Sequence, residues 1–123
     1  MKPNNDHSHL DELAAILSDV GAAAIWRPVY DHRGRRLAAG VGDPADGLAD
    51  SLPADLFKGK RVVDIGCNFG TFTFLAASKG ARFVLGVDID KRIIRGCKIL
   101  KKLFRAENVE FASADLRSLD ENQ

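Results

Sequence analysis

The chain has 123 residues, which suits one small domain, and its hydrophobic content of 46% is enough to form a core. Its 18 Lys and Arg residues nearly balance its 17 Asp and Glu residues, which excludes an acidic solvating tail and a polybasic nucleic-acid arm over the chain as a whole. Two cysteines without a C-x-x-C pair, and no run of about 18 apolar residues, predict a cytoplasmic protein without a disulfide framework, metal site or membrane span.

The first part of the chain predicts a short helix. Residues 1–9 are polar, so we expect them to be frayed, and His7 and His9 lack the further ligands that a metal site needs. Apolar residues then recur at helical spacing over residues 10–20, and Gly21 follows as a stop signal.

A β-hairpin and a surface connection are predicted next. Residues 25–41 form two extended pieces around the turn signal at residues 31–34. Residues 42–60 are rich in Gly, Pro, Asp and Ala, which is typical of a connection on the surface.

Strands and helices alternate in the second half. An apolar run typical of a strand buried on both faces stands at residues 61–66, and further strands are predicted at 82–88 and, with an exit turn, at 108–115. Helices are predicted at 71–79, ended by a glycine, and at 91–105. Strands joined by helices of this length form right-handed βαβ units in a parallel sheet, with the ligand site at the carboxyl ends of the strands. We therefore expect an α/β fold with a Rossmann-like parallel sheet.

The loop after the first of these strands, "DIGCNFG", opens a helix whose first N–H groups lack intrahelical partners, so a strongly polar ligand is expected there. Gly66 permits close approach of the backbone, and Gly70 lets the helix start close to the strand. Asn68 replaces a second glycine, and Asn tolerates positive φ. The fingerprint G-x-G-x-x-G would need glycine at positions 68 and 71, so an NAD-type dehydrogenase is disfavoured.

Acidic residues end the other two strands. Asp88 can accept hydrogen bonds from both hydroxyls of a ribose, Ile89 can cover an adenine face, and Asp115 can accept a hydrogen bond from the exocyclic amine of the base. The structural alternative is that these carboxylates, like Asp64, only cap nearby backbone.

Three segments, "VVDIGCNFG", "VLGVDID" and "VEFASADL", together resemble the first motifs of the class I S-adenosylmethionine-dependent methyltransferases, over about residues 56–119. The resemblance implies S-adenosylmethionine as the cofactor. It also implies which residues contact that cofactor. The loop on the methionine side would be formed by Asp64, Gly66, Cys67, Asn68 and Gly70, and Asn68 departs from the family pattern D-x-G-x-G-x-G. Asp88 would lie at the ribose, Ile89 against the adenine, and Asp115 with Leu116 at the adenine edge.

The same resemblance implies an incomplete domain. Residues 1–55 would be an N-terminal extension, and residues 56–123 the first half of a sheet that has the strand order 3-2-1-4-5-7-6 in the family. Substrate-reading and catalytic residues follow the fourth strand there, so we expect a truncated domain that is inactive alone, and neither a catalytic base nor a methyl acceptor is indicated. An open edge on the first strand favours a second copy or another chain as its cover.

Basic residues dominate the helix at 91–105, for which Asp90 is the predicted N-cap. It has seven Lys or Arg residues and no acid, which allows either a nucleic-acid stripe or a solvated face, and the absence of interleaved aromatic residues favours the solvated face. A non-catalytic or RNA-binding module is therefore the alternative function. Trp26, Tyr30 and the arginines of the hairpin are interpreted as packing and solubility residues, with substrate contact as the other reading.

Overall fold

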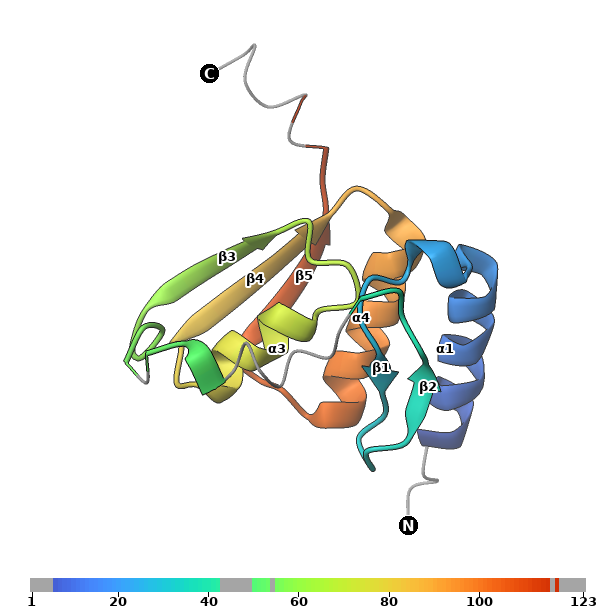
Figure 1. Cartoon of the computed structure of the whole chain (residues 1–123), viewed down its shortest axis with the longest axis horizontal. Helices are drawn as coiled ribbons and strands as arrows, with labels where there is room; N and C mark the ends of the chain where they lie inside the picture. Colours follow the sequence, from blue (N-terminus) through green and yellow to red (C-terminus); the bar gives the residue numbers. More distant parts are fainter. Residues whose placement is uncertain (1–5, 43–49, 54, 116, 118–123) are drawn as a thin grey trace.

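The computed structural model describes residues 6–42, 50–53, 55–115 and 117 (Figure 1). Its elements in chain order are α1 (Asp6–Val20), the 3-10 helix η1 (Ala22–Ala24), β1 (Val29–Tyr30), β2 (Arg36–Ala38), β3 (Arg61–Ile65), α3 (Thr71–Ser78), β4 (Phe83–Asp88), α4 (Lys91–Phe104) and β5 (Val109–Ser113). The predicted helix, hairpin and strand–helix alternation are therefore confirmed. Residues 43–49 of the predicted connection lie outside the described part.

A parallel sheet with the order β3-β4-β5 forms the centre of the fold. Val63 of β3 lies beside Leu85 of β4, which in turn lies beside Glu110 of β5. Because α3 and α4 connect neighbouring strands from one side of the sheet, the strands run parallel and their carboxyl ends meet at one edge (Figure 1). The Rossmann-like α/β fold is confirmed.

The two faces of the sheet differ in their covering. Val84 and Val109 are fully buried under the helices. On the opposite face of β3, Val63 is 58% and Ile65 is 66% exposed. The prediction that this strand is buried on both faces is wrong for the described residues. An apolar sequence shows that both faces of a strand can be buried, but it does not show whether helices or other strands cover each face. In the same residues, β3 pairs only with β4, so its other edge is open.

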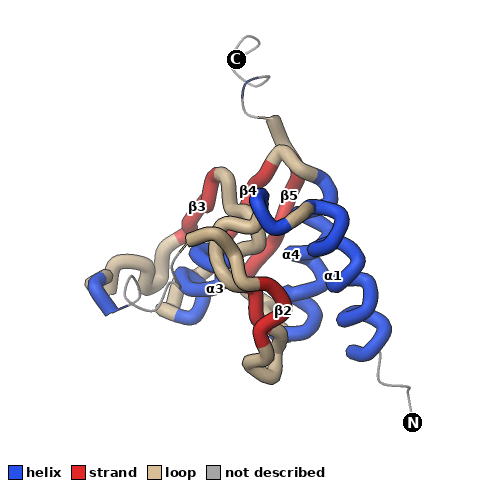
Figure 2. The backbone as a smooth tube through the Cα atoms, turned by 45° about the vertical axis from the view of Figure 1, so that its right-hand side comes forward, coloured by secondary structure: helices blue, strands red, loops and turns tan. Residues whose placement is uncertain are grey.

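The N-terminal helix belongs to the same core as the sheet. Leu13, Ile16 and Leu17 of α1 are buried in one apolar cluster with residues of α4, and Figure 2 shows the two helices side by side. A Cβ at Gly96 of α4 would lie only 2.8 Å from the ring of Phe69, so this glycine permits the close packing of the loop after β3 on α4. Helix α1 starts at Asp6, so the expectation that residues 6–9 are frayed is wrong. Packing of the following turns on α4 extends the helix into this polar stretch.

The hairpin is held by its turn. β1 and β2 are antiparallel, and the carboxylate of Asp31 accepts hydrogen bonds from the backbone N–H of Arg33 (2.8 Å), the backbone N–H of Arg35 (2.9 Å) and Nε of Arg35 (2.8 Å). Asp31 is 2% exposed as a residue, so these bonds satisfy a buried charge.

Helix ends follow the predicted signals. Asp90 accepts hydrogen bonds from the backbone N–H groups of Arg92 and Ile93, as an N-cap does, and Gly80 after α3 has a φ of 93°. At the end of α4, Phe104 is 38% exposed and its ring contacts that of Phe74 edge-on. Across the described ranges, no helix is long and apolar enough to span a membrane.

Candidate functional site

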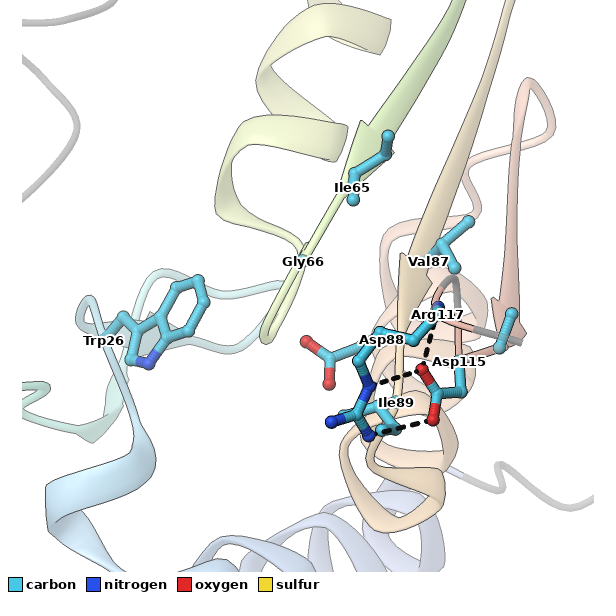
Figure 3. Close-up of a pocket in the computed structure, with 9 residues that line it drawn as sticks. Trp26, Ile65, Gly66, Val87, Asp88, Ile89, Asp115 and Arg117 are labelled. Atoms are coloured by element: carbon cyan, nitrogen blue, oxygen red, sulfur yellow. Dashed lines mark hydrogen bonds and ion pairs between the residues drawn. The ribbon is translucent and has the colours of Figure 1, made fainter. Parts of the chain in front are cut away.

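The carboxyl ends of the three parallel strands surround a hollow of about 310 Å³, called here the larger hollow (Figure 3). Its lining brings together Gly66, the neighbours Asp88 and Ile89, and Asp115, which come from three separate segments of the sequence. The remaining lining residues are Trp26, Ile65, Val87, Ala114 and Arg117.

Asp88 has its carboxylate fixed by backbone donors on both sides. Its Oδ2 accepts a hydrogen bond from the N–H of Asn68 and its Oδ1 from the N–H of Asp90, both at 3.0 Å. The side chain is 9% exposed and lies at the end of β4, against the larger hollow. A buried carboxylate held by two N–H groups keeps its remaining lone pairs available for hydroxyl donors.

A smaller hollow of about 160 Å³ lies on the other side of Gly66. Its lining includes Asp64, Cys67 and Asn68, together with Trp26, Arg27, Gly66, Thr71 and Phe72. Burial raises the pKa of Asp64 above its ordinary value, although the hydroxyl of Thr73 donates a 2.7 Å hydrogen bond to its Oδ2 and opposes the rise. Such a carboxylate gains from a cationic partner, which favours its charged form.

The loop between the two hollows has the backbone that its glycines predict. Gly66 and Gly70 have φ values of 69° and 83°, and Asn68 adopts 49°. The expected tolerance of Asn for this conformation is confirmed. Cys67 is buried, and both its thiol and that of Cys97 lie within hydrogen-bonding distance of the carbonyl oxygen of Asn68, at 3.4 and 3.0 Å.

Asp115 carries an ion pair that the sequence did not predict. Arg117 donates from Nε and Nη2 to its two carboxylate oxygens, both at 2.9 Å (Figure 3). These hydrogen bonds lower the pKa of Asp115, so the group is a carboxylate at neutral pH. Leu116, the other residue expected at this end of the site, lies outside the described residues.

Trp26, like Arg117, is a lining residue that sequence reasoning did not place here. It belongs to the N-terminal segment, yet it lines both hollows. Of the sequence signals, only its aromatic character pointed to a binding role; its contact with a loop some forty residues later is a tertiary feature.

The basic helix α4 is partly neutralised by its neighbours. Arg92 pairs with Asp19 and Asp90, Arg95 pairs with Glu12 of α1, and Lys101 pairs with Glu110 of β5. Three of the six basic side chains of α4 therefore have acidic partners, in agreement with a solvated face. Nucleic-acid binding by this helix stays a prediction.

Comparison with known proteins decides the family. Residues 56–123 match the family profile described as a methyltransferase domain. The chain belongs to the class I S-adenosylmethionine-dependent methyltransferases. The predicted family and its cofactor, S-adenosylmethionine, are thereby confirmed.

Relatives of this methyltransferase chain are larger. It is 39% identical over 61 residues to a ribosomal protein L11 methyltransferase from Thermotoga neapolitana, covering 50% of the chain and 20% of the relative. It is 47% identical over 49 residues to protein arginine N-methyltransferase 1 from Saccharomyces cerevisiae, covering 40% of the chain and 14% of that protein. The chain thus spans about a fifth or less of the length of these two proteins.

A solved structure shares the fold over almost the whole chain. The N-terminal domain of EvdMO1, solved in the presence of S-adenosylhomocysteine and D-fucose, superimposes with a TM-score of 0.68 at 20% identity, covering 95% of this chain and 48% of the other. Because 95% of the chain is covered, the superposition includes α1 and the hairpin, which precede residue 56.

The residues of the two hollows fit the methyltransferase cofactor. A Cβ at Gly66 would have only Cη2 of Trp26 within 4 Å, at 3.8 Å, so the strand end leaves room for a ligand. Asp88 offers an oriented carboxylate for hydroxyl groups, and Asp64 offers a partly buried one for an ammonium group.

Proposed function

We propose that this chain forms the cofactor-binding part of a methyltransferase and holds S-adenosylmethionine across the larger and smaller hollows. The observation that carries the proposal is the carboxylate of Asp88, buried at the end of β4 and fixed by the N–H groups of Asn68 and Asp90. A carboxylate held in this way accepts the two ribose hydroxyls without reorganising.

The other residues take roles set by their positions. Ile89, which is 55% exposed, covers the adenine, and Asp115 accepts a hydrogen bond at the adenine edge while Arg117 keeps it ionised. On the other side of the loop, Asp64 faces the methionine ammonium group. Gly66 and Gly70 let the backbone approach the ligand, and Cys67 contributes its backbone while its thiol is buried.

When bound, S-adenosylmethionine supplies a methyl group activated by its sulfonium. The residues described here bind and orient that group, and none of them is assigned as a base for the acceptor. Methyl transfer by the whole protein, the identity of its acceptor and the inactivity of this part alone belong to the proposal, and so does a cytoplasmic location, which the free thiols of Cys67 and Cys97 support.

The open edge of β3 belongs to the same proposal. Val63 and Ile65 expose apolar side chains on the uncovered face of this strand, and in the described residues the outer edge has no pairing strand. Unpaired edges invite strand addition. Further strands, from the same polypeptide, a second copy or another chain, would cover this edge and bring the acceptor site.

Titration calorimetry with S-adenosylhomocysteine tests the proposal, with NADH as the comparison ligand. We expect saturable heat with S-adenosylhomocysteine, none with NADH, and at least tenfold weaker binding by Asp88→Ala, since hydrogen bonds to a charged group contribute about 1.5–3 kcal/mol each. Equal binding by the wild type and Asp88→Ala, or no heat at millimolar S-adenosylhomocysteine, would contradict it.

A further inference from the structure

Asn68 joins the cofactor loop to the N-terminal segment through its side chain. Its Oδ1 accepts a 3.1 Å hydrogen bond from the N–H of Trp26, and its Nδ2 donates a 3.0 Å hydrogen bond to the carbonyl oxygen of Ala24. Asn68 itself is 6% exposed, and both bonds are partly shielded from water. The amide therefore acts as a two-point clamp between segments more than forty residues apart, which a glycine at this position cannot do.

The backbone of Trp26 is held from a second direction. Its carbonyl oxygen accepts a 2.6 Å hydrogen bond from the N–H of Gly42, in the return segment of the hairpin. A Cβ at Gly42 would lie 2.8 Å from that oxygen, so the close approach requires the glycine. The hydrogen bonds to Asn68 and Gly42 together leave the backbone at Trp26 little freedom to move.

Trp26 as a residue is nevertheless 52% exposed, and its indole points toward Gly66 in Figure 3. Its Cη2 atom would lie 3.8 Å from a Cβ at Gly66, just after the end of β3, and Trp26 and Gly66 line both the larger and the smaller hollow. A half-exposed aromatic residue on a backbone fixed from two sides is positioned to contact a ligand that extends from one hollow to the other.

We propose that Trp26, clamped by Asn68, contacts the centre of the cofactor and favours its sulfonium form over the neutral thioether. This inference rests on the proposed function. With the adenosine in the larger hollow and the amino-acid end in the smaller, the sulfur atom that joins these parts lies at their junction, beside the indole. A cation near the face of Trp is attracted by the ring quadrupole, whereas a neutral thioether lacks that attraction.

Calorimetric titration of matched variants with S-adenosylmethionine and S-adenosylhomocysteine tests the idea. Trp26→Leu keeps apolar bulk without a π face, and Trp26→Phe keeps a smaller one. We expect Trp26→Leu to lower the preference for S-adenosylmethionine over S-adenosylhomocysteine by about 2–5-fold, the size of an exposed cation–π contact, and Trp26→Phe to lower it less.

Asn68→Gly tests the clamp. Glycine keeps the positive φ of 49° and the backbone N–H that donates to Asp88, and it removes only the side-chain bonds. We expect faster hydrogen exchange at the N–H of Trp26 and about 2–10-fold weaker binding of both ligands. Because Trp26 is the one tryptophan of the chain, its emission should also shift when ligand is added to the wild-type protein.

The outcomes separate this inference from the proposed function. If the wild type binds neither ligand, the proposed function fails and the inference with it. If the wild type binds both ligands, three results would each overturn the inference alone. They are an unchanged ligand preference in Trp26→Leu, hydrogen exchange and ligand affinity in Asn68→Gly that equal those of the wild type, and Trp26 emission that saturating ligand does not alter. Emission of the wild type decides the contact even if a variant does not fold.

Discussion

The carboxylate of Asp88 and the backbone N–H of Asn68 form a 3.0 Å hydrogen bond that ties the end of β4 to the loop after β3. The bond is buried and links residues twenty positions apart. It makes the shape of the loop depend on the same carboxylate that is proposed to bind the ribose, so stability and ligand binding share one group.

Asp88→Asn should therefore weaken both properties. The amide has one acceptor oxygen in place of two, so one of the N–H groups of Asn68 and Asp90 loses its partner. An unsatisfied buried donor costs about 1–3 kcal/mol, and we expect the free energy of unfolding in urea to fall by that amount. Affinity for S-adenosylhomocysteine should fall at least tenfold in calorimetry.

Glu107→Gln is the matched control for this change. It makes the same acid-to-amide substitution at an exposed residue outside both hollows. It should alter the free energy of unfolding by less than about 0.5 kcal/mol and leave ligand affinity unchanged. Equal effects of the two substitutions would show that Asp88 has no special role.

Gly70→Ala should destabilise the fold through both backbone and packing. Gly70 has a φ of 83°, and a Cβ there would lie 3.0 Å from Phe74 and 3.1 Å from Phe111. The left-handed conformation costs a residue with a Cβ about 1–2 kcal/mol, and overpacking adds about 1–3 kcal/mol. We expect a total loss of about 2–5 kcal/mol in urea unfolding.

Gly34→Ala separates the two contributions. Gly34 has a φ of 79°, but a Cβ there would meet nothing within 4 Å. This variant should lose only the backbone part, about 1–2 kcal/mol. If both alanine variants lose the same free energy, the packing of Phe74 and Phe111 leaves room for a methyl group and the steric argument is wrong.

Sequence patterns predicted the βαβ half of the fold and the residues at its strand ends, because periodicity and turn residues act locally. Asp88 and Asp115 could be placed in one site since parallel strands end at one edge. Trp26 could not, because its position depends on the Asn68 clamp across the chain. The exposure of Ile65 was also missed, since an apolar side chain does not report whether a second layer covers it.

Asp31→Ala should loosen the hairpin. Burial alone would raise the pKa of Asp31, but hydrogen bonds from Arg35 and Arg33 outweigh it, so the pKa lies below 3.8. The carboxylate therefore stabilises the fold above pH 3.8, and this contribution is lost as the pH falls through the lower folded-state pKa. We expect a loss of about 1–3 kcal/mol at neutral pH in urea unfolding, which shrinks at acid pH. Exposed Asp11→Ala, as the control, should show neither effect.

Asp64 should give the opposite dependence on pH. Burial raises its pKa, hydrogen bonds from Thr73 oppose the rise, and the charge of Asp88 adds to it, so the folded-state pKa lies above 3.8. Between 3.8 and that pKa the native state binds more protons than the unfolded state, and the free energy of unfolding falls as the pH rises. Asp64→Asn keeps an acceptor for Thr73 and removes the titration. Its stability relative to the wild type should therefore rise across this window and level off above it.

Binding gives a second measurement of the same carboxylate. An ammonium group beside Asp64 favours the ionised form, so the affinity of the wild type for S-adenosylhomocysteine should increase with pH through the raised pKa of Asp64 and then become constant. Asp64→Asn should bind more weakly and lack this increase. Urea unfolding and calorimetry at matched pH values between about 3.5 and 7 test both expectations, since this range begins near the ordinary pKa of Asp. If the free energies of unfolding of the wild type and Asp64→Asn depend on pH in the same way, the raised pKa of Asp64 is contradicted. If the two proteins show the same pH dependence of ligand affinity, Asp64 does not contact the ammonium group.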